Sequence, residues 1–312
     1  FTSFIKLLFL FDYYNNYYYY YFIMEGKDDE GWTHIDYDRE IELGERIGGG
    51  GVGIIYKGWY HDTPVALKTL FDPRVDDKLK REYMDELLVM SKLNHSNIVS
   101  FLGACMVPPK LCFVMELCQT SLYHLLHHDR VEYSEVDCVR MSLDVASAME
   151  YLHAQRPAII HRDLKTLNVL IAFNGAAKIC DFGLVKNPNT QAGTPAYMAP
   201  ELFQNKSYNK SVDVYAFGVF MWELFTGDIP FYMVEIMDIR QKVIEGGRPR
   251  IPASIPSRIS TLIRRSWEQD RDERPDFTQI VDELYEITDS LPASKHTENM
   301  DSKDALDSLL RK

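Results

Sequence analysis

The stretch 161–168 brings together side chains that could carry out chemistry. It reads His-Arg-Asp-Leu-Lys-Thr-Leu-Asn, and a further acid, Asp181, follows beside Phe and Gly. A single Asp in a loop most often forms a turn or caps a helix. Here Asp163, Asn168 and Asp181 stand at a defined spacing, bracketed by the apolar strands expected over 168–171 and 177–180. Carboxylate and amide oxygens suit a hard cation such as Mg²⁺, so we expect catalytic residues rather than turn formers.

A glycine-rich segment lies further towards the N-terminus. Gly48, Gly50 and Gly53 follow each other between strand-like flanks. Glycines let backbone amides approach phosphate oxygens without a Cβ in the way. A glycine loop between two strands suits a hairpin, whereas a dinucleotide-binding loop would open a helix. Taken alone the motif is weak, because a glycine-rich surface turn explains it equally well.

A lysine and a glutamate form a second candidate group. Lys68 ends the apolar run Val-Ala-Leu-Lys, where an exposed lysine that aids solubility is the alternative. In the helix predicted over 77–93, the spacing places one carboxylate on an otherwise apolar face made of Tyr83, Glu86, Leu87 and Met90. A carboxylate buried alone costs too much free energy. We therefore expect Glu86 to pair with Lys68; the alternative is a solvated Glu86 at the rim of the face.

From about residue 42 to about residue 287, roughly four-fifths of the chain, the sequence resembles a eukaryotic protein kinase domain. The motifs above carry the resemblance, together with Ala-Pro-Glu ending at Glu201. The resemblance implies that Arg274 is the buried ion-pair partner of Glu201. It also implies that Asp213 anchors the catalytic-loop backbone from a buried helix.

The resemblance implies an α+β fold with two lobes. A small N-lobe, expected over 41–117, has an antiparallel sheet and one main helix. The larger C-lobe, expected over 118–289, is mainly helical. Within it, an amphipathic helix is indicated by apolar residues at helical spacing, namely Val139, Leu143, Ala146 and Met149. The segment 212–225 is apolar nearly all round, which predicts a buried central helix.

The resemblance also implies ATP and Mg²⁺ as cofactors. Asp163 would orient the proton of the substrate hydroxyl, while Asn168 and Asp181 would hold magnesium. Lys165, Lys68 and Glu86 complete the catalytic set. The expected ATP-binding residues are Ile47, Gly48, Gly50, Gly53, Ile55, Ala66, Lys68, Met115, Glu116, Cys118 and Leu170.

Two positions indicate the acceptor. Lys165 and Thr194 are similar to those of serine/threonine kinases, whereas segments such as 94–99 and 101–105 resemble tyrosine-kinase-like families. The mixture resembles the tyrosine kinase-like group, which includes Raf-type and mixed-lineage kinases. We therefore expect an ATP-dependent protein serine/threonine kinase that transfers the γ-phosphate to protein substrates in intracellular signalling.

Two alternatives remain open. One is a dual-specificity or tyrosine kinase, which Lys165 and Thr194 argue against. The other is a catalytically weak pseudokinase scaffold. A scaffold has usually lost one member of the catalytic set, and this chain has all of them, namely Lys68, Glu86, Asp163, Asn168 and Asp181.

Regulation is expected in the short segment 184–198. Thr190 is the candidate phosphorylation site, with Arg162 as the cation that would bind the phosphate. An unmodified polar loop residue explains Thr190 equally well. We expect Thr194 to be hydrogen-bonded near the catalytic Asp and Tyr197 to be packed.

Composition limits the remaining function classes. The chain has 312 residues, which is room for a kinase domain and little more. Its net charge of −12 argues against nucleic acid or an anionic membrane as the main partner. Raf-type relatives dimerise, so a kinase dimer is a further partner to consider, although no residue compels it. Five scattered cysteines indicate reduced thiols in a cytoplasmic protein; Cys180 is expected to be a small buried residue, with reactivity towards electrophiles as the alternative.

The ends of the chain differ from its middle. Residues 1–23 contain an apolar piece too short for a membrane span, followed by a tyrosine run. We expect a non-native leader with Met24 as the true start; a membrane-tethering segment is the alternative. Residues 24–40 form an acidic lead-in, and 290–312 are expected to be a polar tail with a weak helix.

Overall fold

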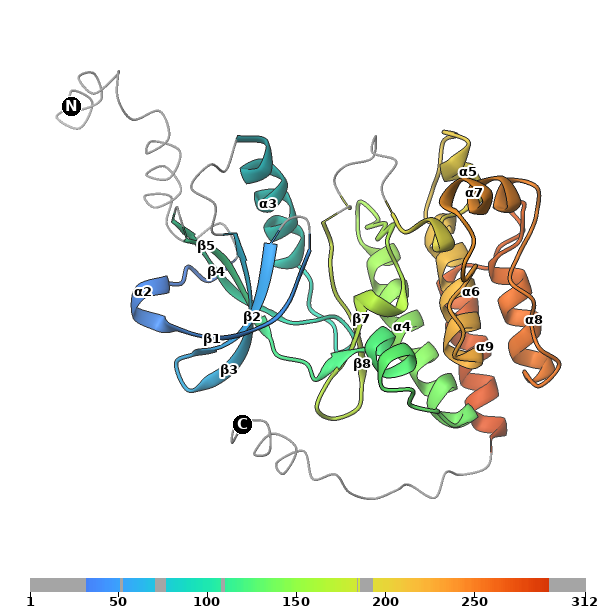
Figure 1. The fold of residues 1–312 in the computed structure, drawn as a ribbon, viewed down its shortest axis with the longest axis horizontal. Coiled ribbons are helices and arrows are strands. Elements are labelled where there is room, and N and C mark those ends of the chain that lie inside the picture. Colours follow the sequence, from blue (N-terminus) through green and yellow to red (C-terminus); the bar gives the residue numbers. More distant parts are fainter. Residues whose placement is uncertain are drawn as a thin grey trace. The chain divides into compact units, whose positions relative to one another are not determined.

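The computed structural model describes residues 32–50, 53–70, 77–107, 110–183, 185 and 193–291. These divide into two compact units (Figure 1). The first unit consists of the chain up to Lys92 together with Phe101–Leu117. The second unit consists of Leu93–Ser100 and the chain from Cys118 onward. The expected leader, the end of the expected tail and Thr190 lie outside the described residues.

The first unit is built on a five-stranded antiparallel sheet. Its strands are β1 (Ile41–Gly50), β2 (Gly53–Tyr60), β3 (Thr63–Leu70), β4 (Phe101–Val107) and β5 (Lys110–Glu116). They lie in the order β1-β2-β3-β5-β4. A tight hairpin connects β2 to β3: the two strands pair from Tyr60 opposite Thr63, across a two-residue turn in which His61 has a left-handed backbone.

Helix α3 (Asp77–Met90) packs on this sheet through the face predicted from its spacing (Figure 1). Tyr83, Leu87 and Met90 are buried. The hydroxyl of Tyr83 donates to the Lys68 carbonyl at 2.7 Å, and its ring stacks on Phe113 with centroids 3.9 Å apart. The helix ends three residues before the predicted end, and a single helical turn, α2 (Tyr37–Glu40), is added ahead of β1.

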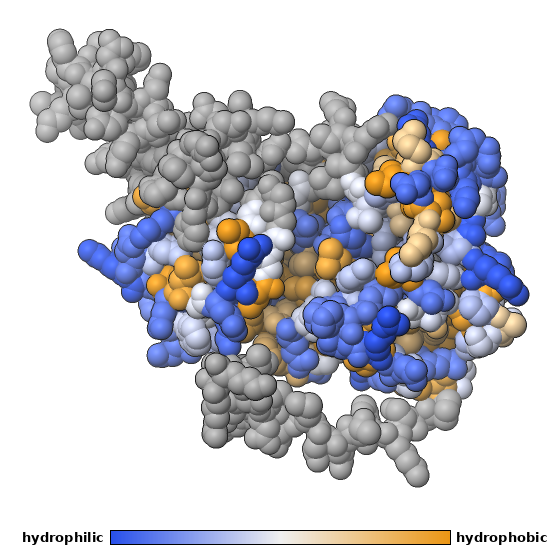
Figure 2. Space-filling view, viewed as in Figure 1, coloured by the Kyte–Doolittle hydropathy of each residue, from blue (hydrophilic) through white to orange (hydrophobic). Residues whose placement is uncertain are grey.

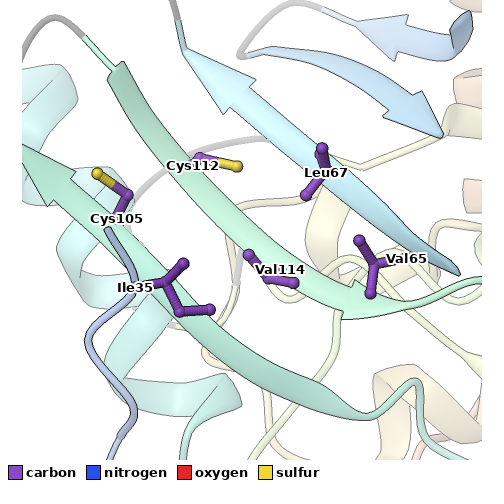
Figure 3. Packing of buried hydrophobic residues seen from close by; sticks show 6 residues of the cluster. All are labelled: Ile35, Val65, Leu67, Cys105, Cys112 and Val114. Carbon is purple, nitrogen blue, oxygen red and sulfur yellow. The ribbon is translucent and has the colours of Figure 1, made fainter. Parts of the chain in front are cut away.

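The core of the first unit includes a residue from the acidic lead-in. Ile35 is buried and packs with Val65, Leu67, Cys105, Cys112 and Val114, as Figure 3 shows. Backbone hydrogen bonds hold it there: the Ile35 N–H donates to the Ala104 carbonyl at 2.9 Å, and the Ala104 N–H donates to Thr33 at 3.0 Å. A Cβ on Gly103 would lie 2.6 Å from the Ile35 side chain, so the glycine makes room for it.

The second unit is mainly helical. After a π-helical turn (His124–His128) its helices are α4 (Glu135–Ala154), α5 (Pro200–Phe203), α6 (Ser211–Thr226), α7 (Ile236–Ile244), α8 (Ser257–Ser266) and α9 (Phe277–Ser290). Three short strands, β6 (Thr120–Ser121), β7 (Val169–Ile171) and β8 (Ala177–Ile179), form a second antiparallel sheet. An antiparallel-sheet unit with one main helix and a mainly helical unit confirm the predicted fold class.

Helix α6 is the centre of the second unit. It is buried along almost its whole length, as its apolar sequence predicts, and it contacts α4 and α8. Gly227 ends it in the left-handed conformation that glycine adopts without strain, at φ 69°. Helix α4 follows the cap Ser134 and buries Val139, Ala146 and Met149, as its spacing predicts, whereas Leu143 is only half-buried.

A buried ion pair joins distant parts of this unit. Arg274 donates to both carboxylate oxygens of Glu201, at 2.7 and 3.0 Å. The Arg274 side chain is completely buried and that of Glu201 nearly so. Arg274 also donates to the Ser211 carbonyl at 3.0 Å, at the start of α6. This pair is the one that the sequence resemblance implied.

Within the described part of the chain, none of the helices is long and apolar enough to cross a membrane.

Replacing Ile35 by Ala should test its place in the core. We expect the free energy of unfolding to fall by about 2–5 kcal/mol, because a buried isoleucine side chain leaves a cavity. The matched control is Ile47→Ala at a half-exposed position of the same sheet, which should cost well under that. Urea unfolding measures both, and equal losses would contradict the core assignment.

Replacing Arg274 by Ala should destabilise the second unit by about 3–5 kcal/mol, because Glu201 is left charged and buried. Arg265→Ala removes a surface pair with Glu283 and should cost at most about 1 kcal/mol. The double variant Arg274→Met with Glu201→Leu should recover much of the loss. A double variant as unstable as Arg274→Ala would show that lost packing, and not the unpaired charge, is responsible.

Candidate active site

The loop from His161 to Asn168 is held by one carboxylate of the second unit. Asp213 lies in the first turn of α6 and is fully buried. Its Oδ2 accepts from the His161 N–H at 2.9 Å, and its Oδ1 accepts from the Arg162 N–H at 2.8 Å. Asp213 therefore fixes the backbone at the start of the loop.

Sequence reasoning missed a third partner of Asp213. The Nε2 atom of His153 lies 2.8 Å from Asp213 Oδ2. Burial would raise the pKa of Asp213, but the hydrogen bond and charge of His153 and the N–H of Arg162 hold it below its ordinary value. A signal was present: His153 follows Met149 by four residues, so helical spacing places a polar ring on the buried face of α4.

His161 links this loop to the segment that carries Asp181. The imidazole is completely buried. Its Nδ1 accepts from the Asp163 N–H at 3.3 Å, and its Nε2 donates to the Cys180 carbonyl at 3.1 Å. Its ring also meets Phe182 edge to face, with centroids 5.3 Å apart. An Nε2–H tautomer, assigned from these partners, satisfies both hydrogen bonds.

Asp163 is the hub of a closed polar network. Its Oδ1 accepts from the backbone N–H and from the hydroxyl of Thr194, both at 3.0 Å. Its Oδ2 accepts from Lys165 Nζ at 2.6 Å and from Asn168 Nδ2 at 3.0 Å. Lys165 Nζ also donates to the Thr194 hydroxyl at 2.7 Å. The side chain of Asp163 is therefore fixed in one orientation by three neighbours.

Asn168 and Asp181 are brought together by the backbone. The Cys180 N–H donates to the Asn168 carbonyl at 3.0 Å, so Asp181 follows the residue bonded to Asn168. Asn168 Nδ2 donates to the Asp163 carbonyl at 2.8 Å, which commits the amide nitrogen and directs Oδ1 the other way. Asp181 has a left-handed backbone, with φ 68°, a strained conformation that is common at functional sites.

In the first unit, Lys68 and Glu86 form an ion pair. Lys68 Nζ lies 2.6 Å from Glu86 Oε1, and the two side chains are only 12% and 6% exposed. The pair joins β3 to α3. Glu86 thus lies inside the apolar face of the helix and not at a solvated rim.

The glycine motif forms the end of the hairpin of β1 and β2. Gly48 pairs with Ile55, and Gly50 pairs with Gly53. A Cβ on Gly53 would lie 2.9 Å from the Thr69 carbonyl, so packing against β3 requires a glycine there. At Gly48 the nearest atom to an added Cβ is 3.8 Å away, so packing does not explain that glycine.

The other expected ATP-binding residues lie on several strands. Ile47 is exposed on β1, and Ile55 on β2 is half-buried opposite Lys68. Ala66 and Met115 face each other across β3 and β5 and are buried. Three further residues are half-buried: Glu116 at the end of β5 and, in the second unit, Cys118 and Leu170.

Arg162 and Tyr197 have defined surroundings. The guanidinium of Arg162 lies 5.2 Å from the centre of the Tyr208 ring. Its expected partner, Thr190, is outside the described residues. Tyr197 is packed as expected: its hydroxyl donates to the fully buried carboxylate of Glu223, which also lies 2.7 Å from His127 Nε2.

Burial and the Glu223 carboxylate raise the pKa of Tyr197 well above its ordinary value, so its phenol keeps its proton. Sequence reasoning missed Glu223 as an anchor. The signal was an acid near the end of a helix that is otherwise apolar nearly all round, since such a buried charge needs partners.

Comparison with known proteins identifies protein kinases as relatives. Three curated relatives are serine/threonine-protein kinase STY46, probable serine/threonine-protein kinase SIS8 and serine/threonine-protein kinase STY17, all from Arabidopsis thaliana. They are 36%, 39% and 33% identical to this chain over 80% of its length. The match covers 44%, 25% and 45% of those relatives, so the chain spans less than half of each.

The family match carries the assignment. Residues 41–284 match the family described as protein tyrosine and serine/threonine kinase, while the relatives above are serine/threonine kinases by name. This combination confirms the predicted resemblance to the tyrosine kinase-like group. The chain belongs to the protein tyrosine and serine/threonine kinase family.

Proposed function

We propose that this protein is an ATP-dependent serine/threonine kinase that transfers the γ-phosphate of ATP to hydroxyls of protein substrates. Protein kinases as a family use ATP as the phosphoryl donor. The observation that carries the proposal is the closed network in which Lys165, Thr194 and Asn168 fix both oxygens of Asp163. A carboxylate held in this way is oriented to receive a proton from an incoming hydroxyl.

Lys165 and Thr194 support a short acceptor. Both place polar atoms directly against Asp163, within 2.6 to 3.0 Å. They form a polar wall on the acceptor side, which suits the short side chains of serine and threonine. Lys165 also places positive charge where negative charge of the transferred phosphoryl group develops.

Asn168 and Asp181 fit a magnesium site. Their donor atoms are oxygens, which Mg²⁺ prefers, and the hydrogen bonds of Asn168 direct its Oδ1 away from Asp163. When bound with ATP, the ion would neutralise phosphate charge. The chain's own contribution is to hold the two oxygens in place through the Asn168 to Cys180 backbone bond.

The first unit supplies most of the remaining nucleotide-binding groups in this proposal. Lys68, held by Glu86, would bind the α- and β-phosphates as a fixed cation. The glycine hairpin at Gly48, Gly50 and Gly53 would bring backbone amides to the phosphates. The base would contact Ile47, Ile55, Ala66, Met115, Glu116, Cys118 and Leu170.

We also propose that the kinase domain spans 41–289, with an N-lobe over 41–117 and a C-lobe over 118–289. Ile35 of the lead-in, ahead of these bounds, adds one buried side chain to the core of the N-lobe. A cytoplasmic location is proposed from the cysteines, all five of which are free thiols. Phosphorylation of Thr190, with Arg162 as its partner, remains part of the proposal.

Phosphoryl transfer should depend on the two acids. With labelled ATP, magnesium and peptides containing Ser, Thr or Tyr acceptors, we expect label on serine or threonine. Asp163→Asn and Asp181→Asn should each lower kcat by about 10²–10⁴-fold. The matched control is Asp272→Asn on the surface, which should keep full activity.

Hydrolysis of the product identifies the labelled amino acid. Label on tyrosine alone would overturn the serine/threonine assignment. Nucleotide binding without any transfer would instead support the pseudokinase reading.

The role of Asp213 should appear in the pH dependence of the free energy of unfolding. Its lowered pKa means that its contribution to folding is complete above about pH 4 and is lost as pH falls through the folded-state pKa. We expect Asp213→Asn to lower the free energy of unfolding by about 1–3 kcal/mol near pH 7, and this difference to shrink below about pH 4. The kcat should fall as well, since the loop backbone loses its anchor.

Asp144 provides a control, because its pKa is shifted in the opposite direction to that of Asp213. It accepts from the Ala177 N–H, but burial raises its pKa. The wild type should therefore gain stability relative to Asp144→Asn as pH falls through the raised pKa. Parallel pH profiles for the two variants, measured by urea unfolding, would contradict the role given to Asp213.

A further inference from the structure

The most exposed large apolar side chains of the described residues lie together in one short segment. They are Tyr232, Met233, Ile236 and Met237, which are 67%, 86%, 62% and 70% exposed. The next most exposed, Tyr285 on α9, reaches only 54%. We call these four residues the α7 patch. Figure 2 shows apolar atoms gathered over the region of α5 and α7.

The α7 patch is not the packing face of its helix. Ile239 and Val243, four residues apart, are buried and form the face that α7 turns to the core. Ile236 and Met237 lie in the first turn and remain exposed. Exposing four large apolar side chains together is unfavourable in water, and such patches mark interaction sites.

The backbone holds these side chains out under strain. Phe231 and Met233 have φ angles of 55° and 61°, in the left-handed region that non-glycine residues avoid. Two turns keep them there: Tyr232 N–H donates to Ile229, and Val234 N–H donates to Phe231, at 3.2 and 3.0 Å. Strain of this kind collects at functional surfaces.

The sequence segment that carries the α7 patch has charges of one sign. Between residues 227 and 239 the sequence contains Asp228, Glu235 and Asp238, and it contains no lysine or arginine. Arg240 follows, but its guanidinium donates to the Phe203 carbonyl at 3.0 Å on α5. The complementary surface is apolar with cations at its edge.

The α7 patch is also next to the acceptor side of the proposed active site. Helix α7 packs against the short turn Pro195–Tyr197. That turn directly follows Thr194, whose hydroxyl and N–H bind Asp163. A chain that delivers its hydroxyl to Asp163 can therefore reach the patch with a neighbouring segment.

We propose that the α7 patch docks a segment of the protein substrate in which apolar side chains alternate with lysine or arginine. The inference rests on the proposed kinase function and names the substrate class of that site. Methionine-rich apolar surfaces adapt to varied side chains, and the acidic rim selects basic sequences. Docking raises the effective concentration of the acceptor, so it lowers KM and leaves kcat unchanged.

The test uses two kinds of synthetic peptide. The first is a short acceptor peptide with one serine. The second joins the same acceptor to a segment of alternating lysine and leucine through about eight Gly-Ser residues, which reach roughly 16 Å. The linked peptide is made in two versions, one with the segment before the acceptor and one with the segment after it. Wild-type kinase should show a KM about tenfold lower for at least one linked peptide, at equal kcat.

Variants of the α7 patch locate the effect. Ile236→Ser with Met237→Ser should remove the KM advantage and leave the acceptor peptide unaffected. Tyr285→Ser, an exposed apolar side chain elsewhere, should change neither. Glu235→Gln with Asp238→Asn should weaken the advantage severalfold and reduce its salt dependence. Circular dichroism checks that each variant is folded.

Several outcomes would overturn the proposal. One is an equal KM for acceptor and linked peptides in the wild type; another is a KM advantage that survives in the patch variants. If sedimentation shows a dimer that Ile236→Ser with Met237→Ser dissociates, the α7 patch pairs two copies and the proposal is wrong.

The proposed function and the docking proposal can fail separately. Fluorescence anisotropy of the labelled lysine–leucine segment measures binding without catalysis. Binding that the patch variants abolish, with no transfer to any peptide, would leave docking intact and refute the kinase assignment. Transfer to the acceptor peptide without such binding would support the kinase assignment and refute the docking proposal.

Discussion

The arrangement of the second unit depends on the buried carboxylate of Asp213. It takes three hydrogen bonds, two from the backbone N–H groups of His161 and Arg162 and one from the ring of His153. A carboxylate without such partners could not stay charged at complete burial. Because two of its three donors are backbone groups of one loop, the hydrogen bonds that satisfy the buried charge also fix the conformation of the loop. The positive φ of Arg162, 68°, shows that the loop is held in a conformation that the residue itself disfavours.

Hydrogen bonds from this fixed loop also hold the proposed catalytic residues in place. His161 donates to the Cys180 carbonyl, and Asn168 accepts from the Cys180 N–H. Cys180, the residue before Asp181, is therefore held through both of its backbone polar groups. Thr194 closes the network from the other direction by binding Asp163 with both its N–H and its hydroxyl. Cys180, next to Asp181, and Thr194 are thus both hydrogen-bonded to the same loop.

Sequence reasoning could foresee contacts whose two partners each carried their own signal. Lys68 ended an apolar strand and Glu86 interrupted an apolar helix face, so each needed the other. It could not foresee partners that are satisfied only by tertiary structure. The hydrogen bond from His153 to Asp213 joins residues 60 positions apart, and a lone histidine in a helix gives no indication of its partner. Ile35 was missed as a core residue because it stands alone in an acidic stretch, and only its pairing with Ala104 on β4 brings it inside. The predicted helix over 77–93 runs three residues too far, because no glycine or proline in 88–93 marks the end that the structure places at Met90.

Helix α6 emerges as the frame on which separate loops are fixed. Asp213 near its start holds the catalytic loop, and Glu223 near its end accepts from Tyr197 at the close of the segment that contains Thr194. At its first residue, the Ser211 carbonyl accepts from Arg274, which in turn pairs with Glu201. Buried ionic contacts of this kind contribute little net stability, since desolvation offsets much of the attraction. Their effect is on uniqueness: each loop can satisfy its buried charge in one position only. An otherwise apolar helix that carries two buried acids therefore fixes the geometry around Asp163 from both ends. The role proposed for Asp163, that of a general base, needs this fixed geometry more than it needs additional stability.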